Sequence, residues 1–141
     1  MKPQWALAMA VLGLAGMTLA GCNGVGNAPP DPLDGTAWLL VSLDGKDSLP
    51  GIDITAVFEG GSLHGSSGCN RFGASYEIHR DSIEIREIQS TLMACIAPEG
   101  AMDQEQEFIA RLSSSERYQI ADGRLRLMSS DRDLLTFVPQ D

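Results

Sequence analysis

Residues 74–86 read ASYEIHRDSIEIR, and this stretch indicates how the chain folds. Large apolar residues alternate with polar ones on both sides of a central Arg-Asp pair: Tyr76, Ile78, Ile83 and Ile85. Alternation with a period of two is typical of a β-strand that has one face on a core. The Arg-Asp pair stands where a two-residue turn is needed, so the stretch predicts a β-hairpin with strands at 74–79 and 82–86.

The same pattern of short apolar runs and turn residues continues in both directions. Gly60-Gly61 separates two such runs and Asp122-Gly123 separates two more, and both dipeptides are typical of tight hairpin turns. About eight strands are expected in residues 35–141, which predicts a mainly β (α+β) fold built on a small antiparallel β-barrel. The further expected strands are 37–43, 54–59, 62–67, 117–121, 124–128 and 134–138.

One stretch lacks this pattern. Residues 98–113 read PEGAMDQEQEFIARLS with Ile109 as their only β-branched residue, and we expect them to form the one substantial α-helix. Met102, Ile109 and Leu112 can share one face of this helix, which we expect to be buried. The carboxylates at positions 103–107 are expected to lie on a solvated face.

Length and charge narrow the class of protein. The chain has 141 residues, which is enough for one ordinary domain. Nineteen Asp and Glu side chains against ten Lys and Arg give a formal net charge of −9. Because an acidic surface repels phosphate backbones, we do not expect nucleic acid as a partner.

The N-terminus has the features of an export signal. Lys2 precedes an apolar run over residues 5–19, and small residues follow this run. A helix of that run would span about 22 Å, which is short of the roughly 30 Å hydrocarbon core of a bilayer. We therefore expect a removable signal peptide at residues 1–21 rather than a transmembrane anchor.

Leu19-Ala20-Gly21-Cys22 resembles the lipobox of bacterial lipoproteins, in which the cysteine is acylated and becomes the mature N-terminus. We expect lipid on Cys22, with ordinary secretion and cleavage near the same place as the alternative. Several acyl chains make membrane attachment effectively permanent. Asn23, in place of the Asp that favours retention at the inner membrane, favours the outer membrane with the domain facing the periplasm.

Residues 22–34 are expected to form the lipid anchor and a flexible tether, because residues 23–34 are rich in Gly, Asn and Pro. Loss of Lys2 with the signal peptide leaves a net charge of −10. Such a surface avoids anionic lipid, so we expect contact with the membrane through the anchor alone.

Two cysteines, Cys69 and Cys95, remain in the expected exported domain. An oxidising compartment favours a disulfide between them, and two buried reduced thiols are the alternative. Only His64 and His79 could join these thiols at a metal, and their spacing does not resemble a zinc module. We expect no metal and no cofactor.

Residues 65–76, GSSGCNRFGASY, and residues 90–95, STLMAC, together resemble the paired signature of the META-domain family. The resemblance extends over residues 34–138. It implies a small β-barrel of lipocalin-like topology with one helix, in a family that includes a heat-inducible bacterial lipoprotein. It also implies an association with envelope stress, secretion or motility, and no defined molecular activity.

The signature has a physical interpretation as well. Gly65, Gly68 and Gly73 allow a positive φ or a close approach of backbones, as at a barrel corner. Asn70 can cap or bridge backbone groups, and Arg71 can pair with a carboxylate. A structural motif is the favoured interpretation. The competing hypothesis is that Asn70 and Arg71 form a binding corner for an acidic ligand or partner.

The sequence contains no nucleophile elbow, P-loop or visible set of acid, base and nucleophile, so we expect no catalytic residues and no enzyme activity. The expected function is that of a lipid-anchored, monomeric envelope protein with a non-enzymatic binding, stress-response or envelope-maintenance role. Its expected partners are the membrane, through the anchor, and an envelope protein or a small ligand. The alternative is a periplasmic inhibitor of a lytic enzyme or protease, since an acidic barrel suits a cationic enzyme.

Overall fold

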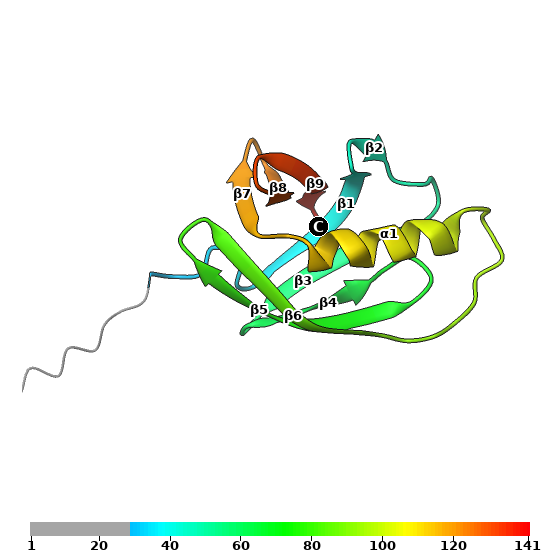
Figure 1. The fold of residues 1–141 in the computed structure, drawn as a ribbon, viewed down its shortest axis with the longest axis horizontal. Helices are drawn as coiled ribbons and strands as arrows, with labels where there is room; N and C mark the ends of the chain where they lie inside the picture. Colours follow the sequence, from blue (N-terminus) through cyan, green and yellow to red (C-terminus); the bar gives the residue numbers. More distant parts are fainter. Residues whose placement is uncertain (1–28) are drawn as a thin grey trace, which may run out of the picture.

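The computed structural model describes residues 29–141, so the expected signal peptide, Cys22, Asn23 and the first part of the tether lie outside the described residues. Within these residues the chain forms nine strands and one helix (Figure 1). Their bounds are β1 Thr36–Leu43, β2 Lys46–Asp47, β3 Thr55–Glu59, β4 Ser62–Ser66, β5 Arg71–His79, β6 Ser82–Ser90, α1 Ala101–Ser113, β7 Arg117–Ala121, β8 Arg124–Ser129 and β9 Arg132–Pro139.

The strands form one antiparallel sheet that closes on itself. From β4 to β9 each strand pairs with the strand before it, β3 pairs with β1, and β9 returns to pair with β1. This arrangement confirms the predicted mainly β fold with one helix, and its neighbour-to-neighbour order is that of an up-and-down barrel. The strand beyond the predicted eight is the two-residue β2, which follows the Asp44-Gly45 turn and pairs with the end of β1.

The barrel wall is incomplete between β6 and β7. Only Ser82 and Arg117 pair across these two strands. The helix α1 lies over this region and contacts both β6 and β9 (Figure 1). A helix therefore completes the part of the wall that the hydrogen-bonded ladder leaves open.

A β-bulge in the hairpin of β5 and β6 explains why the sequence underestimates the length of β6. Between the pairs Gly73–Gln89 and Ser75–Arg86, β6 has one residue more than β5. Glu87, with φ 56°, lies in this step. An extra residue interrupts the period of two. The pattern-based prediction therefore ends β6 too early.

The packed part of the chain begins before residue 35. Leu33 is fully buried in the core, and the Tyr76 hydroxyl donates to Asp31 Oδ2 at 2.6 Å. Burial and this hydrogen bond raise the pKa of Tyr76 well above its ordinary value. The Gly60 amide donates to Asp34 Oδ1 at 2.7 Å. Residues 31–34, expected as the end of the tether, therefore belong to the domain.

The helix α1 starts later than the predicted range of 98–113. It begins at Ala101 because Gly100 has φ 84°, outside the right-handed helical region. Phe108 anchors α1 to the barrel through an edge-to-face contact with Phe72 of β5, with ring centroids 5.4 Å apart. Met102 and Ile109, which we expected on the buried face, are half-buried beside it. The buried residues of α1 are Ala101, Glu105, Phe108 and Leu112.

Candidate binding site

Two of the three signature glycines, Gly65 in β4 and Gly68 in the loop between β4 and β5, stand where the structure requires glycine. A Cβ at Gly65 would lie 2.0 Å from the Thr55 carbonyl oxygen, so only glycine permits this approach of β4 to β3. Gly68 has φ 113°, a conformation that side chains rarely allow. Gly73 lies within β5 with open space where a Cβ would stand. The expectation of a corner is therefore wrong for Gly73.

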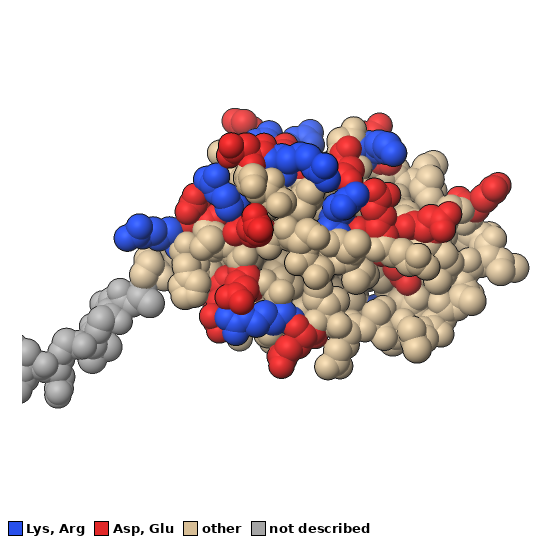
Figure 2. Space-filling model, viewed as in Figure 1, with Lys and Arg blue, Asp and Glu red and all other residues tan. Residues whose placement is uncertain are grey.

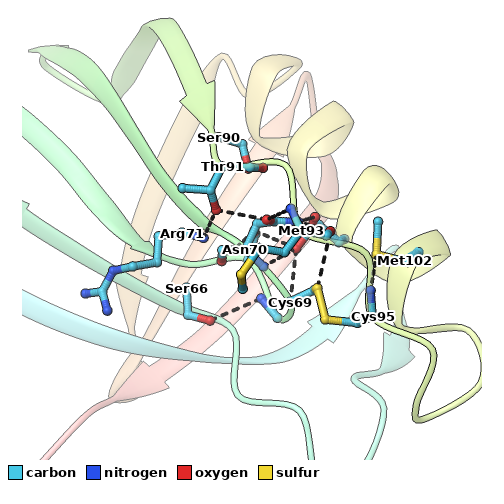
Figure 3. Close-up of a disulfide and its surroundings, with 12 residues drawn as sticks. Ser66, Cys69, Asn70, Arg71, Ser90, Thr91, Met93, Cys95 and Met102 are labelled. Carbon is cyan, nitrogen blue, oxygen red and sulfur yellow. Dashed lines mark hydrogen bonds between the residues drawn. A yellow bond between two sulfur atoms is a disulfide. The ribbon is translucent and has the colours of Figure 1, made fainter.

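A disulfide joins this loop to an extended segment that we call the strap, residues 91–98, which connects β6 to α1. Cys69 and Cys95 form the disulfide that the sequence predicts, with their Cα atoms 5.8 Å apart (Figure 3). The Cys95 amide also donates to Met102 Sδ at 3.4 Å. The strap is therefore connected to both the barrel and α1.

Glu105 is the centre of a buried group of hydrogen bonds. It is 6% exposed, whereas the sequence predicts a solvated face for the carboxylates at 103–107. Its Oε2 accepts from the Ser67 hydroxyl at 2.8 Å and from the amides of Cys69 and Asn70 at 3.1 and 2.7 Å. Its Oε1 accepts from Asn70 Nδ2 at 2.5 Å. The prediction is wrong because these partners lie 35 to 38 residues away in the sequence.

The hydrogen bonds hold Glu105 in its ionised form. Burial raises the pKa of this carboxyl, but the hydrogen bonds from Asn70, Ser67 and Cys69 lower it by more, so the pKa lies below its usual range. A hydrogen bond to a charged group contributes about 1.5–3 kcal/mol. Glu105 is therefore a strong connection between α1 and the loop.

Asn70 connects the same loop to the strap and is only 3% exposed. Its Oδ1 accepts from the Thr91 hydroxyl at 2.8 Å and from the Met93 amide at 2.7 Å, and its Nδ2 donates to the Met93 carbonyl oxygen at 3.1 Å. Asn70 bridges backbone groups and is not available to an external ligand, which corrects its assignment as a direct binding residue. We call these six residues the Asn70 cluster: Ser67, Cys69, Asn70, Thr91, Met93 and Glu105.

Arg71 does not share a surface with Asn70. It is the first residue of β5, it is exposed, and its side chain points away from the Asn70 cluster (Figure 3). Within residues 29–141 no carboxylate lies within 4.0 Å of its guanidinium, so Arg71 forms no ion pair there. Arg71 borders an open depression of about 500 Å³ together with Glu87 and Gln89.

A groove lies between the strap and α1. It has a volume of about 680 Å³ and a largely apolar lining. Glu105 is its only charged lining residue, and the Asn70 cluster already occupies that carboxylate. The apolar lining comes from both sides of the groove: Leu92, Met93 and Ala94 of the strap, and Met102, Ile109 and Ala110 of α1.

The strap carries the most exposed large apolar side chains of the described chain. Leu92 is 98% exposed and Ile96 is 97% exposed. Residues 89–98 carry no charged side chain, and Figure 2 shows a largely uncharged area below α1, where the strap runs. Exposed apolar patches on folded domains mark interaction sites. The uncharged run at residues 89–98 is visible in the sequence and could have indicated this surface. The face of α1 that lies opposite the run has no such signal in the sequence.

Neither histidine takes part in this site. His64 of β4 and His79 of β5 are exposed, and His79 Nε2 lies 3.6 Å from Glu77 Oε2. The part of the chain that the structure describes contains no group of three or more His, Cys, Asp or Glu side chains placed to hold a metal ion. Within residues 29–141 no helix is both long enough and apolar enough to cross a membrane.

These features of residues 29–141 define a class of protein: a small, closed antiparallel barrel in which the helix α1 and a disulfide-bonded strap enclose an open apolar groove. The META domain model matches residues 31–141, and the chain belongs to the META-domain family. A search of curated proteins returns no match.

Solved structures share the fold. A protein from Burkholderia xenovorans, solved by NMR, is 25% identical with a TM-score of 0.64, and the match covers 80% of this chain and 92% of that one. A DUF4847 family protein from Bacteroides vulgatus, solved by crystallography, is 15% identical with a TM-score of 0.58, over 78% of this chain and 97% of that one.

Proposed function

We propose that this chain is a lipid-anchored protein of the bacterial envelope with a non-enzymatic binding role, and that the groove between the strap and α1 is its binding surface. The observation that carries the proposal is the position of the Asn70 cluster beneath the strap. Its hydrogen bonds hold Met93 of the strap, and Leu92 and Met93 line an apolar groove of about 680 Å³ opposite α1 on an acidic domain. Ligand sites of proteins have volumes of about 300–1,000 Å³ and mostly apolar linings.

The state of Glu105 supports binding over catalysis. A general acid or base works best with a pKa near the operating pH and with a proton-accepting oxygen free to meet the substrate. The pKa of Glu105 lies below its usual range, and its two oxygens accept four hydrogen bonds from the protein itself. This carboxylate therefore acts as a structural element of the groove floor.

Attachment to the envelope is supported by the sequence. The apolar run at 5–19 ends in Leu19-Ala20-Gly21-Cys22, and Asn23 follows the acceptor cysteine. With lipid on Cys22, the domain is held at the outer membrane and faces the periplasm. An oxidising compartment is also where a disulfide such as Cys69–Cys95 persists.

The acidic charge supports a second candidate function, inhibition of a cationic lytic enzyme or protease. All nineteen acidic residues lie in residues 29–141, which contain nine basic ones. Charge-steered association weakens steeply with salt, whereas burial of an apolar surface does not. Binding that is lost completely on raising the salt from about 50 to about 500 mM favours the inhibitor, and binding that weakens but persists favours the apolar groove.

Site-specific photo-crosslinking in cells tests the proposal. A photoreactive residue at position 92 lies in the groove, whereas one at Ile120 on β7 is at an exposed apolar position away from it. We expect crosslinked adducts from position 92 and none from position 120. Equal yields from the two positions, or no adduct from position 92, would contradict the groove as the binding surface.

A further inference from the structure

We infer that the groove binds the apolar face of a basic amphipathic helix from a partner protein; this inference rests on the proposed function, because it names the occupant of the same groove. The shape of the site gives the first argument. A small-molecule pocket buries 70–90% of its ligand. Here Leu92 and Ile96 project from the strap at 98% and 97% exposure, where only a larger surface can cover them.

The pattern of residues on α1 gives the second argument. One face of the helix is turned to the groove, with small, amide or apolar side chains at Met102, Gln106, Ile109, Ala110 and Ser113. Across from it stand Leu92 and Met93 of the strap. Methionines on both sides adapt to different apolar partners. A groove between apolar walls accepts an amphipathic helix through anchor residues at spacings of three and four.

The charge around the groove gives the third argument. No Lys or Arg lines it. Exposed acidic residues stand at its helix side, since Glu99 lies two residues before the start of α1 and Asp103 follows the groove residue Met102. Residues 29–141 as a whole have ten more acidic than basic side chains. Basic residues that flank the apolar face of a partner helix would meet complementary charge here.

The same observations disfavour a membrane as the occupant. A domain with a charge of −10 is repelled by anionic lipid. The start of the described chain, which is the blue end of the ribbon, lies at one end of the long axis of the domain, and the strap runs towards the other end (Figure 1). The tether therefore leaves the domain from the end opposite the strap, which lets the strap face away from the bilayer.

A designed peptide tests the inference. The probe is a fluorescein-labelled, 18-residue Leu/Lys peptide with all leucines on one helical face, and its control has the same composition in scrambled order. Binding to the full-length protein in phosphatidylcholine nanodiscs is measured by fluorescence anisotropy, with empty nanodiscs as the blank. We expect the patterned peptide to bind at least about tenfold more tightly than the scrambled one.

Three variants locate the binding. Leu92→Ser should weaken the binding of the patterned peptide about tenfold, because one leucine contact is lost. Ile120→Ser, at an exposed apolar position outside the groove, should leave binding unchanged. Asp103→Lys should weaken the binding of the Leu/Lys peptide and strengthen the binding of a Leu/Glu peptide of the same pattern. The reason is that this substitution reverses the charge beside the groove.

Equal binding of patterned and scrambled peptides, or patterned binding that Leu92→Ser leaves unchanged, would overturn the inference. The crosslinking experiment separates its failure from that of the proposed function. If position 92 crosslinks to phospholipid, to a small molecule or to a second copy of this chain, only the inference of a basic helix as the occupant is overturned. No adduct from position 92 overturns both.

Discussion

Asn70 contacts Glu105 twice: its Nδ2 donates to Oε1 at 2.5 Å, and its backbone amide donates to Oε2 at 2.7 Å. The Asn70 side chain also accepts from the Met93 amide. One residue therefore joins a barrel loop, the helix and the strap. This buried polar cluster, together with the Cys69–Cys95 disulfide and the hydrogen bond from the Cys95 amide to Met102 Sδ, holds the uncharged strap beside α1.

Replacing Glu105 by Gln should lower the free energy of unfolding by about 2–3 kcal/mol. An amide cannot accept hydrogen bonds at both ends, so its NH₂ group would face a donor and leave a buried donor unpaired. Asp103→Asn, exposed on the same helix, is the control and should stay within about 0.5 kcal/mol of wild type. Urea unfolding measures both variants, and a Glu105→Gln protein as stable as wild type would contradict the role of the cluster.

The lowered pKa of Glu105 predicts a loss of stability in acid. The pKa is lower in the folded chain than in the unfolded chain, so the unfolded chain takes up the proton first as the pH falls. The stability that Glu105 contributes is therefore present above the ordinary glutamate pKa and is lost as the pH falls through the folded value.

Unfolding free energies measured from neutral pH to about pH 3 should fall more steeply for wild type than for Glu105→Gln. The carboxyls of Asp81 and Glu84 also have lowered pKa values, because they accept hydrogen bonds from Arg117 and Arg86. The Asp81 and Glu84 carboxyls are present in both wild type and Glu105→Gln, so the difference between the two pH profiles measures the contribution of Glu105. Parallel pH profiles would show that its ionised form is not stabilised.

The sequence predicted the parts of the fold that depend on local patterns. The alternation of apolar and polar residues around Arg80-Asp81 predicts the central hairpin. The cysteine count, together with the export signal, predicts the disulfide. The position of Glu105 could not be predicted, because a carboxylate in an acidic helical run looks solvated until its distant donors are known. The bulge at Glu87 was missed for a related reason, since it changes the period that the prediction uses.

The two glycines Gly65 and Gly73 should respond differently to the same substitution. A Cβ at position 65 would collide with the Thr55 carbonyl oxygen, so Gly65→Ala should cost about 3 kcal/mol or prevent folding. A Cβ at position 73 meets open space, so Gly73→Ala should change the free energy of unfolding by less than about 1 kcal/mol. Thermal unfolding of the two variants checks this, and equal losses would contradict the assigned close approach of β3 and β4.

Lipid on Cys22 is tested by mass spectrometry of the protein from the membrane fraction. We expect the mature chain to begin at Cys22 with a mass that includes acyl chains, and Cys22→Ser to leave the membrane fraction. Asn23→Ser, beside the acceptor cysteine, is the control and should stay membrane-bound. A mature protein with an unmodified Cys22 thiol would contradict the anchor.

Hydrogen exchange of the Met93 amide tests most directly whether the Asn70 cluster holds the strap. In wild type this amide donates to Asn70 Oδ1 at 2.7 Å, and we expect it to exchange slowly. In Asn70→Ala it should exchange at the rate of an unstructured loop, while the Phe108 amide in α1 keeps its protection and shows that the domain is folded. Fast exchange of Met93 in wild type, or unchanged protection in Asn70→Ala, would contradict the account.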